Sequence, residues 1–267
     1  MSTQPTTPLT STEVPPVIQA DGLQKAYGEV LALRDATFTI GRGEIVGFAG
    51  DNGAGKSTLM SLIAGATTHT GGTLRVDGVE RRSTTPEEAR RDGIEMVYQD
   101  LAMCENLNVY ENIFLGRELT SRVGGVRRLL HTRMRERAHE LLERLGLELT
   151  SVLDPVSSLS GGQRQMVAIC RATAFDPKLI IMDEPTSALS VAAGRPLLEL
   201  IRRLPEQGTA VMMVSHRLSD MLDTSRRIYV VRHGEVTDEV VAAQTSELEL
   251  LHLMEGRPEA AAVPVAS

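Results

Sequence analysis

A glycine-rich loop that ends in a lysine and a serine is the first feature of the sequence that could do chemistry. Glycines let the backbone fold closely around a phosphate group, so that several N–H groups point toward it. The lysine supplies a positive charge for β- and γ-phosphates, and the serine hydroxyl can bind Mg²⁺. The stretch predicts a nucleoside triphosphate site. It fits the pattern GxxxxGK[ST] through Gly50, Asp51, Asn52, Gly53, Ala54, Gly55, Lys56 and Ser57.

Two adjacent carboxylates that follow an apolar run are the second feature. Residues 179–184 read LIIMDE, which is typical of a buried strand that ends at Asp183 and Glu184. Asp183 would hold Mg²⁺ through a water molecule, and Glu184 could accept a proton from a water molecule that attacks the γ-phosphate. The alternative is a buried strand that merely ends in two surface acids. The glycine-rich loop earlier in the chain disfavours this alternative.

A second glycine-containing segment stands where a helix is expected to begin. Residues 159–163 read LSGGQ, and an apolar stripe follows them at helical spacing, formed by Met166, Val167, Ile169, Cys170 and Ala174. The backbone N–H groups at such a helix end attract anions. Because the loop at 50–57 already serves one nucleotide, we expect this helix end to meet a nucleotide held by another copy of the chain. A flexible linker is the alternative. The residues concerned are Ser160, Gly161, Gly162 and Gln163.

The strands and helices that must position these residues alternate along much of the chain. The apolar runs LIIM and AVMMV do not alternate in polarity, which is expected of strands covered on both faces. Strands interleaved with helices predict an α/β fold with a parallel sheet. The helix is expected at 56–65, and the strands are expected at 44–50, 94–99, 179–184, 209–216 and 227–234.

Two regions depart from this alternation. Near the start, the stretches AYGEV, LALRDATFTI and TLRVDG predict short antiparallel strands, and therefore an antiparallel β subdomain. From about Asp100 to Leu159 the pattern is helical, and no strand pattern interrupts it. We therefore expect a helical subdomain, inserted at about 100–160. Its helix over 132–145 would bury one face, formed by Met134, Ala138, Leu141, Leu142 and Leu145.

Composition narrows the class of protein. The 267 residues carry a net charge of −7, so the chain lacks the bulk positive charge of a nucleic-acid binder. No run of 18 or more apolar residues occurs, so we expect no membrane-spanning helix. Cys104 and Cys170 lack metal-ligand spacing, and both are expected to be packed side chains. Residues 1–16 and 257–267 are expected to be a disordered tail and a flexible tail.

The order of the three motifs resembles the nucleotide-binding subunit of ATP-binding cassette (ABC) transporters, over about residues 17–255. The resemblance implies a P-loop NTPase (RecA-like) core that forms an ABC ATPase domain at 17–256, with ATP and Mg²⁺ as ligands. It also implies that Thr58 joins the phosphate loop and that the ring of Tyr27 stacks on adenine.

The same resemblance assigns catalytic and metal-binding roles. Gln99 matches the glutamine that senses Mg²⁺ and contacts the permease, and His216 matches the switch histidine that reaches the γ-phosphate. The implied catalytic set is therefore Glu184, His216 and Gln99. The implied metal ligands are Ser57, Gln99 and Asp183.

One residue departs from the family pattern. The loop after the LIIMDE strand commonly reads SALD in this family, but here residues 187–190 read SALS. Ser190 replaces the aspartate, which puts in question the contacts that the aspartate side chain makes across a dimer. Because Glu184 is intact, we expect hydrolysis to survive, with altered coupling between the two sites.

The stretch YQDLAMCENLNVYENIFLGREL at 98–119 is similar to the monosaccharide branch of the family, the ribose, xylose, fructose and galactose importers. The resemblance implies a peripheral ATPase subunit at the cytoplasmic face of the cell membrane. It would energise sugar import through a separate membrane permease, with a solute-binding protein as an indirect partner. Membrane contact is then expected only through the permease, and nucleic acid is not expected as a partner.

The number of motifs implies a homodimer, because one phosphate loop and one LSGGQ segment cannot complete a composite site within one chain. Three alternative functions stay open. The chain could be a cassette for another cargo, such as amino acids, metals or lipid export. It could be a soluble cassette ATPase that acts on DNA or ribosomes, although such proteins usually carry two cassettes or a long coiled-coil insertion. It could also be a P-loop kinase, against which LSGGQ argues.

Overall fold

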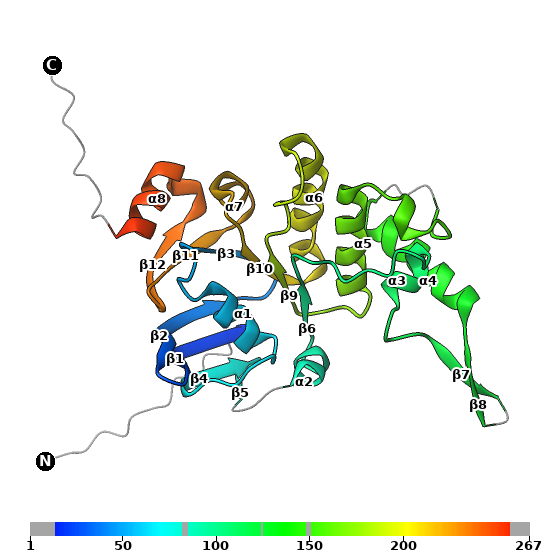
Figure 1. Ribbon diagram of the computed structural model, residues 1–267, viewed down its shortest axis with the longest axis horizontal. Coiled ribbons are helices and arrows are strands. Elements are labelled where there is room, and N and C mark those ends of the chain that lie inside the picture. The colour runs from blue at the N-terminus through cyan, green and yellow to red at the C-terminus, as the bar shows by residue number, and fades with distance from the viewer. Residues whose placement is uncertain (1–13, 82–84, 124, 148–150, 257–267) are drawn as a thin grey trace, which may run out of the picture.

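A curled ten-stranded sheet forms the frame of the protein (Figure 1). The computed structural model describes residues 14–81, 85–123, 125–147 and 151–256. The tails expected at 1–16 and 257–267 therefore lie almost wholly outside the described residues. The strands of the large sheet follow the order β5-β4-β1-β2-β12-β11-β3-β10-β9-β6.

One half of the large sheet is parallel, as the sequence predicts. Successive side chains of its strands enter two different apolar cores. Ile180 and Met182 face one core, whereas Leu179 and Ile181 face the other. This explains why the LIIM run does not alternate in polarity. The strands are β3 (Ile45–Ala49), β6 (Ile94–Val97), β9 (Leu179–Asp183), β10 (Ala210–Val214) and β11 (Arg227–Arg232).

The other half is antiparallel, which confirms the prediction for the start of the chain. The C-terminal strand β12 pairs antiparallel with β11 and touches β2 at the pair Glu235 and Asp35. It therefore joins the two halves into one sheet. The strands of this half are β1 (Ile18–Tyr27), β2 (Val30–Ile40), β4 (Gly71–Val76), β5 (Val79–Glu80) and β12 (Glu235–Val241).

Helices cover both faces of the parallel strands. Helix α1 (Lys56–Ile63) belongs to the core that contains Val46 and Phe48, and α6 (Val191–Arg203) belongs to the opposite core with Ile45 and Ala49. The sheet is thus buried on both sides. The other helices of this part are α2 (Pro86–Arg91), α7 (Leu218–Thr224), α8 (Glu247–Glu255) and the 3-10 turns η2 (Pro205–Gln207) and η3 (Ala242–Gln244).

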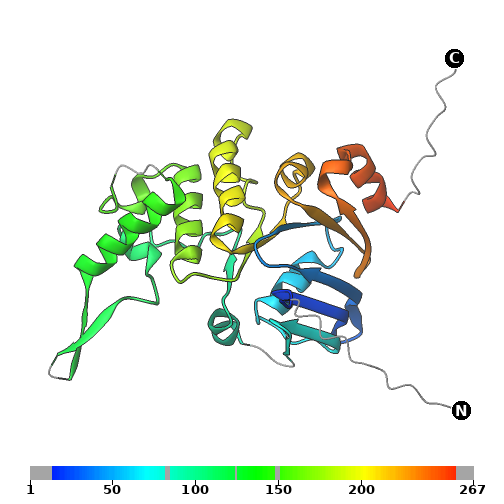
Figure 2. The same ribbon diagram turned by 180° about the vertical axis from the view of Figure 1, so that it is seen from behind.

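The helical subdomain stands at one end of the sheet (Figures 1 and 2). It contains α3 (Val109–Ile113), α4 (His131–Leu145), η1 (Val156–Ser158) and α5 (Gly161–Thr173). All five residues predicted for the apolar face of α4 are buried, and they are Met134, Ala138, Leu141, Leu142 and Leu145.

The expectation that no strand interrupts this helical region is wrong. Strands β7 (Thr120–Val123) and β8 (Val126–Leu129) pair as an antiparallel hairpin between α3 and α4. A pair of glycines between two short runs is a strong local signal for a hairpin. Arginines on both strands hide the alternation of polarity that would otherwise mark them. In the described residues, no helix is long and apolar enough to cross a bilayer.

Candidate active site

A cavity of about 320 Å³ opens where neighbouring parallel strands of the sheet end. The loops after β3, β6, β9 and β10 all reach it. Ligands of open α/β sheets commonly bind at the carboxyl ends of the strands. The cavity brings together side chains from segments that are far apart in the sequence. It is lined by Ala32, Asn52, Gly53, Gly55, Lys56, Ser57, Thr58, Gln99, Asp183, Glu184, Val214 and His216.

The phosphate loop between β3 and α1 requires glycine at two positions. At Gly50, a Cβ atom would lie 2.2 Å from the carbonyl oxygen of Val231. Gly55 has a φ of +114° and would place a Cβ atom 2.8 Å from Leu33. Gly55 is also the N-cap of α1, and no side chain caps this helix end. The loop therefore curls tightly, and its first-turn N–H groups are not occupied by a side-chain cap.

The Lys56 side chain turns back onto the loop. Its Nζ donates hydrogen bonds to the carbonyl oxygens of Gly50, at 2.5 Å, and Asp51, at 2.9 Å. Burial lowers the pKa of Lys56, and the nearby carboxylates of Glu184, Asp51 and Asp183 oppose this shift. The buried cation thus lies beside the two acids of the LIIMDE strand.

Asp183 and Glu184 end strand β9 in different environments. Burial raises the pKa of Asp183, and the charges of Lys56 and His216 act in the opposite direction. Glu184 is 8% exposed, and its Oε2 accepts a hydrogen bond from the backbone N–H of His216 at 3.1 Å. Its Oε1 is buried and has no hydrogen-bond partner among the described residues, and His216 Nε2 lies 3.4 Å away without hydrogen-bond geometry.

Glu184 also has a left-handed backbone conformation, with a φ of +52°. Such a conformation costs a non-glycine residue about 1–3 kcal/mol and persists only where the surroundings fix it. Here the Glu184 N–H donates to Val214 O at 2.9 Å, and the Ser187 hydroxyl donates to Glu184 O at 3.0 Å. The structure therefore holds this carboxylate in one place at the cavity wall.

The LSGGQ segment does not line this cavity. Ser160 is the N-cap of α5, where its hydroxyl accepts from the N–H of Gln163 and its own N–H donates to the Gln163 side chain. Ser160 and Gly161 are exposed and Gly162 and Gln163 are partly exposed, and among the described residues a Cβ atom at Gly161 or Gly162 would meet nothing nearer than 3.7 Å. Packing within one chain therefore does not require these two glycines.

Tyr27 also lies outside the cavity lining. It ends strand β1 and is 49% exposed, so it is not a core tyrosine. The Nζ of Lys25 lies 4.7 Å from the centre of the Tyr27 ring. Its ring is accessible for stacking with a planar ligand.

Ser190 is the N-cap of helix α6, and its hydroxyl accepts a hydrogen bond from the N–H of Ala193 at 3.3 Å. Serine and aspartate cap helices about equally well. The replacement therefore preserves a local role that the family's aspartate could also perform. The guanidinium of Arg217 donates to the carbonyl oxygen of Leu189, the residue before Ser190. Arg217 thus links the loop after β10 to the loop after β9, a contact that no sequence pattern indicated.

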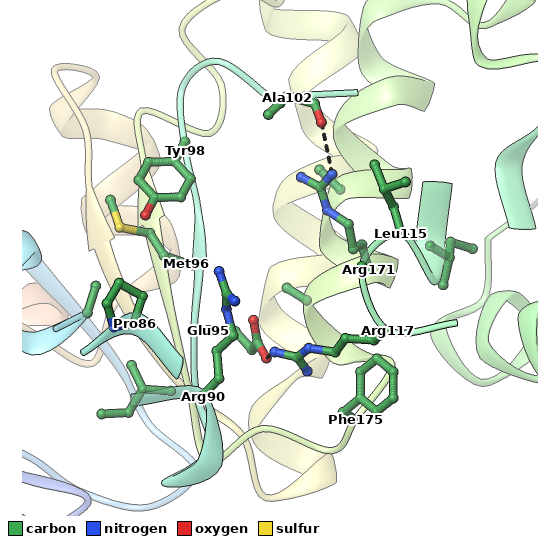
Figure 3. A pocket seen from close by; sticks show the side chains of 16 residues that line it. Pro86, Arg90, Glu95, Met96, Tyr98, Ala102, Leu115, Arg117, Arg171 and Phe175 are labelled. Carbon is green, nitrogen blue, oxygen red and sulfur yellow. Dashed lines mark hydrogen bonds and ion pairs between the residues drawn. The ribbon is translucent and has the colours of Figure 1, made fainter. Parts of the chain in front are cut away.

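A second cavity, of about 350 Å³, forms a groove between α2 and β6 on one side and α3 and α5 on the other (Figure 3). The Arg117 guanidinium contacts the carboxylate of Glu95 and lies 4.6 Å from the centre of the Phe175 ring. Burial raises the pKa of Glu95, although the bond from Arg117 opposes this shift. Exposed rings of Tyr98 and Phe175 add apolar surface. This groove was not predicted, because its lining comes from several segments that are separate in the sequence.

The groove is connected to Gln99 through a short segment. Arg171 of helix α5 donates hydrogen bonds to the carbonyl oxygens of Leu101, at 2.6 Å, and Ala102, at 3.2 Å. It thereby fixes the chain just beyond Gln99, whose side chain lines the first cavity. An arginine beside the apolar stripe of α5 is the signal that could have indicated this role.

Residues 33–187 match the family described as ABC transporter. The chain is 38% identical to the xylose/arabinose import ATP-binding protein XylG of Sulfolobus acidocaldarius, over 89% of this chain and 93% of that protein. It is 42% identical to the fructose import ATP-binding protein FrcA of Rhizobium meliloti, over 82% and 86%. It is 39% identical to a ribose import ATP-binding protein of Escherichia coli O157:H7, over 91% of this chain but only 47% of that protein.

The fold matches solved structures as well. One is a dimeric, post-hydrolysis ATP-binding cassette bound to ADP and phosphate, with a TM-score of 0.71 and 30% identity over 85% of this chain and 100% of the other. Another is the ADP conformation of an ATP-binding cassette of an ABC transporter, with a TM-score of 0.76 and 25% identity over 90% and 95%. The predicted combination of a P-loop core, antiparallel strands and helical subdomain is therefore confirmed.

Proposed function

The chain belongs to the ABC transporter family of ATP-binding proteins, and we propose that it hydrolyses ATP to energise the import of a monosaccharide through a separate membrane permease. The observation that carries this proposal is the cavity that gathers Lys56, Ser57, Asp183, Glu184 and His216. The choice of cargo is supported by relatives that are named for import of xylose and arabinose, fructose or ribose. Two of these relatives are covered over 86% or more of their own length.

The phosphates of ATP would bind in the loop between β3 and α1. Its uncapped helix end and the Lys56 ammonium offer the positive charge that a triphosphate needs. Asn52, Gly53 and Thr58 line the same cavity. Tyr27 would stack on the adenine ring with its exposed face. These contacts are consistent with a substrate that is held mainly by its phosphate groups.

The donor set of the cavity fits Mg²⁺. Ser57, Gln99 and Asp183 bring a hydroxyl, an amide carbonyl and a carboxylate to one place, and oxygen atoms are the ligands that Mg²⁺ prefers. Within the described residues, no cluster of three or more His, Cys, Asp or Glu side chains forms an all-protein metal cage. Mg²⁺ at such sites usually keeps water and substrate phosphates as ligands. When bound, it neutralises the charge that develops on the phosphates.

Glu184 would act as the general base. Its buried Oε1 lacks a hydrogen-bond partner, so it can accept a proton from a water molecule at the cavity wall. The backbone N–H of His216 holds the other carboxylate oxygen at 3.1 Å. The His216 ring is on the same side, where it could donate to a γ-phosphate oxygen. Together these groups orient the water and stabilise the charge of the transferred group.

A second copy of the chain would complete each site. Ser160 and Gly161 of the LSGGQ segment are exposed, and its glycines leave the backbone at the α5 N-terminus open to close approach. One phosphate loop and one LSGGQ segment per chain support a homodimer that encloses two ATP molecules. The similar cassette that is dimeric with ADP and phosphate supports the same arrangement.

The permease would contact the groove of Figure 3. Its exposed aromatic and aliphatic side chains offer apolar contact, and its arginines offer charge. Arg171 connects this surface to the chain beyond Gln99. A movement of Gln99 when the active site closes would therefore change the position of residues that line the groove. The protein would thus be peripheral, at the cytoplasmic face of the membrane. A solute-binding protein on the other side would be an indirect partner.

Co-purification with the permease and sugar uptake test this function. The chain should be isolated from membranes together with an integral membrane subunit, and vesicles that contain both should take up a labelled pentose or fructose when ATP is supplied. A Lys56→Ala chain is the matched control, and it should assemble but not energise uptake. Uptake of a non-sugar cargo alone would favour another transporter, and phosphoryl transfer to a small molecule would favour a kinase.

A further inference from the structure

The β7–β8 hairpin projects from the helical subdomain, away from the rest of the molecule, in both views (Figures 1 and 2). It begins shortly after Arg117, which lines the groove, and the N–H of Leu130 donates to Leu119 O at 2.8 Å to close its base. All four residues of β8 are exposed, with Val126 at 64% and Leu129 at 49%. Nothing in the proposed ATPase mechanism uses this element.

Four arginines make the hairpin and the start of α4 strongly basic. These are Arg122, Arg127, Arg128 and Arg133, in a chain whose net charge is −7. None of them forms an ion pair with a carboxylate in the described part of the chain, whereas Arg117, Arg137 and Arg144 nearby all do. Arg127 donates one hydrogen bond to an uncharged acceptor, the Thr120 hydroxyl, at 3.4 Å. The first turn of α4 contains no acidic residue.

The pairing of the two strands brings like charges together. Arg122 and Arg127 are direct cross-strand partners, and a pair of like charges in this position destabilises an antiparallel ribbon. The fold of the subdomain gains nothing from this pair. An external anion that binds both side chains would remove the repulsion.

A cavity of about 390 Å³ at the base of the hairpin has matching chemistry. Two guanidinium groups, from Arg128 and Arg133, and two hydroxyl groups, from Ser121 and Thr132, line it together with Leu129. Guanidinium groups bind phosphate oxygens in a bidentate manner. The combination of bare arginines with exposed aliphatic side chains is typical of surfaces that lie at the lipid–water interface.

We propose that the β7–β8 hairpin binds the anionic phospholipid headgroups of the membrane, beside the permease. The proposal rests on the proposed function, because the groove that would face the permease adjoins the base of the hairpin. It adds a direct membrane contact to the one made through the permease.

Lipid fits the hairpin better than an acidic protein surface does. Side chains alternate between the two faces of a ribbon, so Arg122 and Arg127 lie on one face and Arg128 lies on the other. A protein partner would cover one face of the hairpin and leave the arginine charge on the other face without a partner. Headgroups around an immersed hairpin can neutralise both faces.

Vesicle co-sedimentation of the full chain, without permease, tests the proposal. The wild type should bind phosphatidylcholine vesicles that contain phosphatidylglycerol, should bind pure phosphatidylcholine poorly, and should dissociate as salt is added. The triple variant Arg122→Gln/Arg127→Gln/Arg128→Gln should bind the anionic vesicles roughly 100-fold more weakly, because each arginine near the surface contributes about fivefold. Its thermal unfolding temperature should be unchanged or higher, since the cross-strand repulsion is gone.

Two further variants make the outcome specific. A charge-matched control, Arg34→Gln/Arg195→Gln/Arg226→Gln, removes three exposed arginines elsewhere and should bind as the wild type does. The variant Arg122→Lys/Arg127→Lys/Arg128→Lys should also bind the anionic vesicles, because the positive charge is kept. Equal binding by the hairpin Gln variant and the wild type would overturn the proposal. So would loss of permease assembly by the hairpin Gln variant in pure phosphatidylcholine, where the wild type still assembles, because the hairpin would then bind a protein surface.

ATP hydrolysis measured on the same samples separates this proposal from the proposed function. If the chain hydrolyses ATP but ignores anionic vesicles, only the lipid contact is wrong. If it binds the vesicles through the hairpin but hydrolyses no ATP, the proposed function is wrong and the lipid contact stands.

Discussion

Glu184 combines three features that are each unfavourable for folding. It is almost fully buried, it holds a left-handed backbone conformation, and one of its oxygen atoms has no hydrogen-bond partner. Each of these costs stability, so the surroundings must hold the residue for a purpose other than folding. Asp183, Lys56 and His216 line the same cavity. We infer that the cavity is arranged for a ligand that satisfies the unpaired oxygen.

Glu184→Gln should abolish most ATP hydrolysis and leave ATP binding intact. The glutamine keeps an oxygen that can accept from the His216 N–H, so the cavity should keep its shape. It cannot take a proton from water, and loss of a positioned base costs roughly 10²–10⁴-fold in rate. Turnover with the permease and calorimetric ATP affinity measure the two effects. Glu199→Gln, an exposed change on α6, is the control, and near-normal turnover of Glu184→Gln would show that another group is the base.

Asp183 should make the free energy of unfolding of the ligand-free protein depend on pH. Its pKa is raised in the folded state by burial, so the protonated form is favoured by folding. The stability contribution is therefore fully present below the ordinary pKa of an aspartate and is lost as the pH rises through the raised pKa. Asp183→Asn should raise the free energy of unfolding at neutral pH and have little effect in acid. Urea unfolding at several pH values, without nucleotide, checks this, and a variant that is less stable at neutral pH would contradict it.

At the scale of elements, each helix start near the site has a different cap. Helix α1 has glycine and no side-chain cap, α5 has the Ser160–Gln163 capping box, and α6 has Ser190. An uncapped start leaves N–H groups for a ligand, whereas a capped start is stable without one. The cap at Ser190 explains how this chain tolerates a serine where relatives of the family commonly have aspartate.

Ser190→Ala should destabilise the protein by about 1 kcal/mol, because the N–H of Ala193 loses its acceptor. Ser190→Asp should keep the cap and leave the free energy of unfolding nearly unchanged. Chemical denaturation of the three proteins tests the role. If Ser190→Ala proved as stable as the wild type while its ATPase activity fell, the side chain would act across the dimer instead of as a cap.

The spacing of apolar residues predicted the elements that bury one face, or both faces, in a core. The apolar face of α4 and the parallel strands β9 and β10 were predicted because a core demands apolar residues at fixed spacing. The hairpin β7–β8 has no core, so no such spacing marks it. The phosphate loop and LIIMDE were recognisable because each is contiguous. The groove around Glu95, Arg117 and Phe175 was not recognisable, because only folding brings its separate segments together.

At the scale of the whole molecule, one chain cannot bring all the predicted nucleotide contacts to one cavity. Lys56 and Glu184 line the cavity, but the LSGGQ segment starts a helix of the other subdomain and faces solvent. Its glycines are not required by any contact in the part of the chain that the structure describes. A ligand that is shared with a second copy would contact both surfaces at once. ATP would then bind the dimer more tightly than the monomer, and this difference is what shifts the equilibrium.

Mixing two inactive chains tests this head-to-tail arrangement. Lys56→Ala removes the phosphate-loop cation, and Ser160→Arg blocks the α5 N-terminus of the other chain. In a mixed dimer one composite site carries both changes and the other carries neither, so the mixture should regain part of the wild-type ATPase activity. At equal concentrations about half of the dimers are mixed if pairing is random. Each mixed dimer has one intact site, so roughly a quarter of wild-type activity is expected if the two sites turn over independently.

Each variant alone should stay inactive, and cross-linking should verify that mixed dimers form. No recovery in verified mixed dimers would mean that the two motifs act on the same nucleotide within one chain, or that one damaged site silences its neighbour. Glu184→Gln with ATP separates these cases, because a shared nucleotide should trap that variant as a dimer, whereas a nucleotide held within one chain should leave it monomeric.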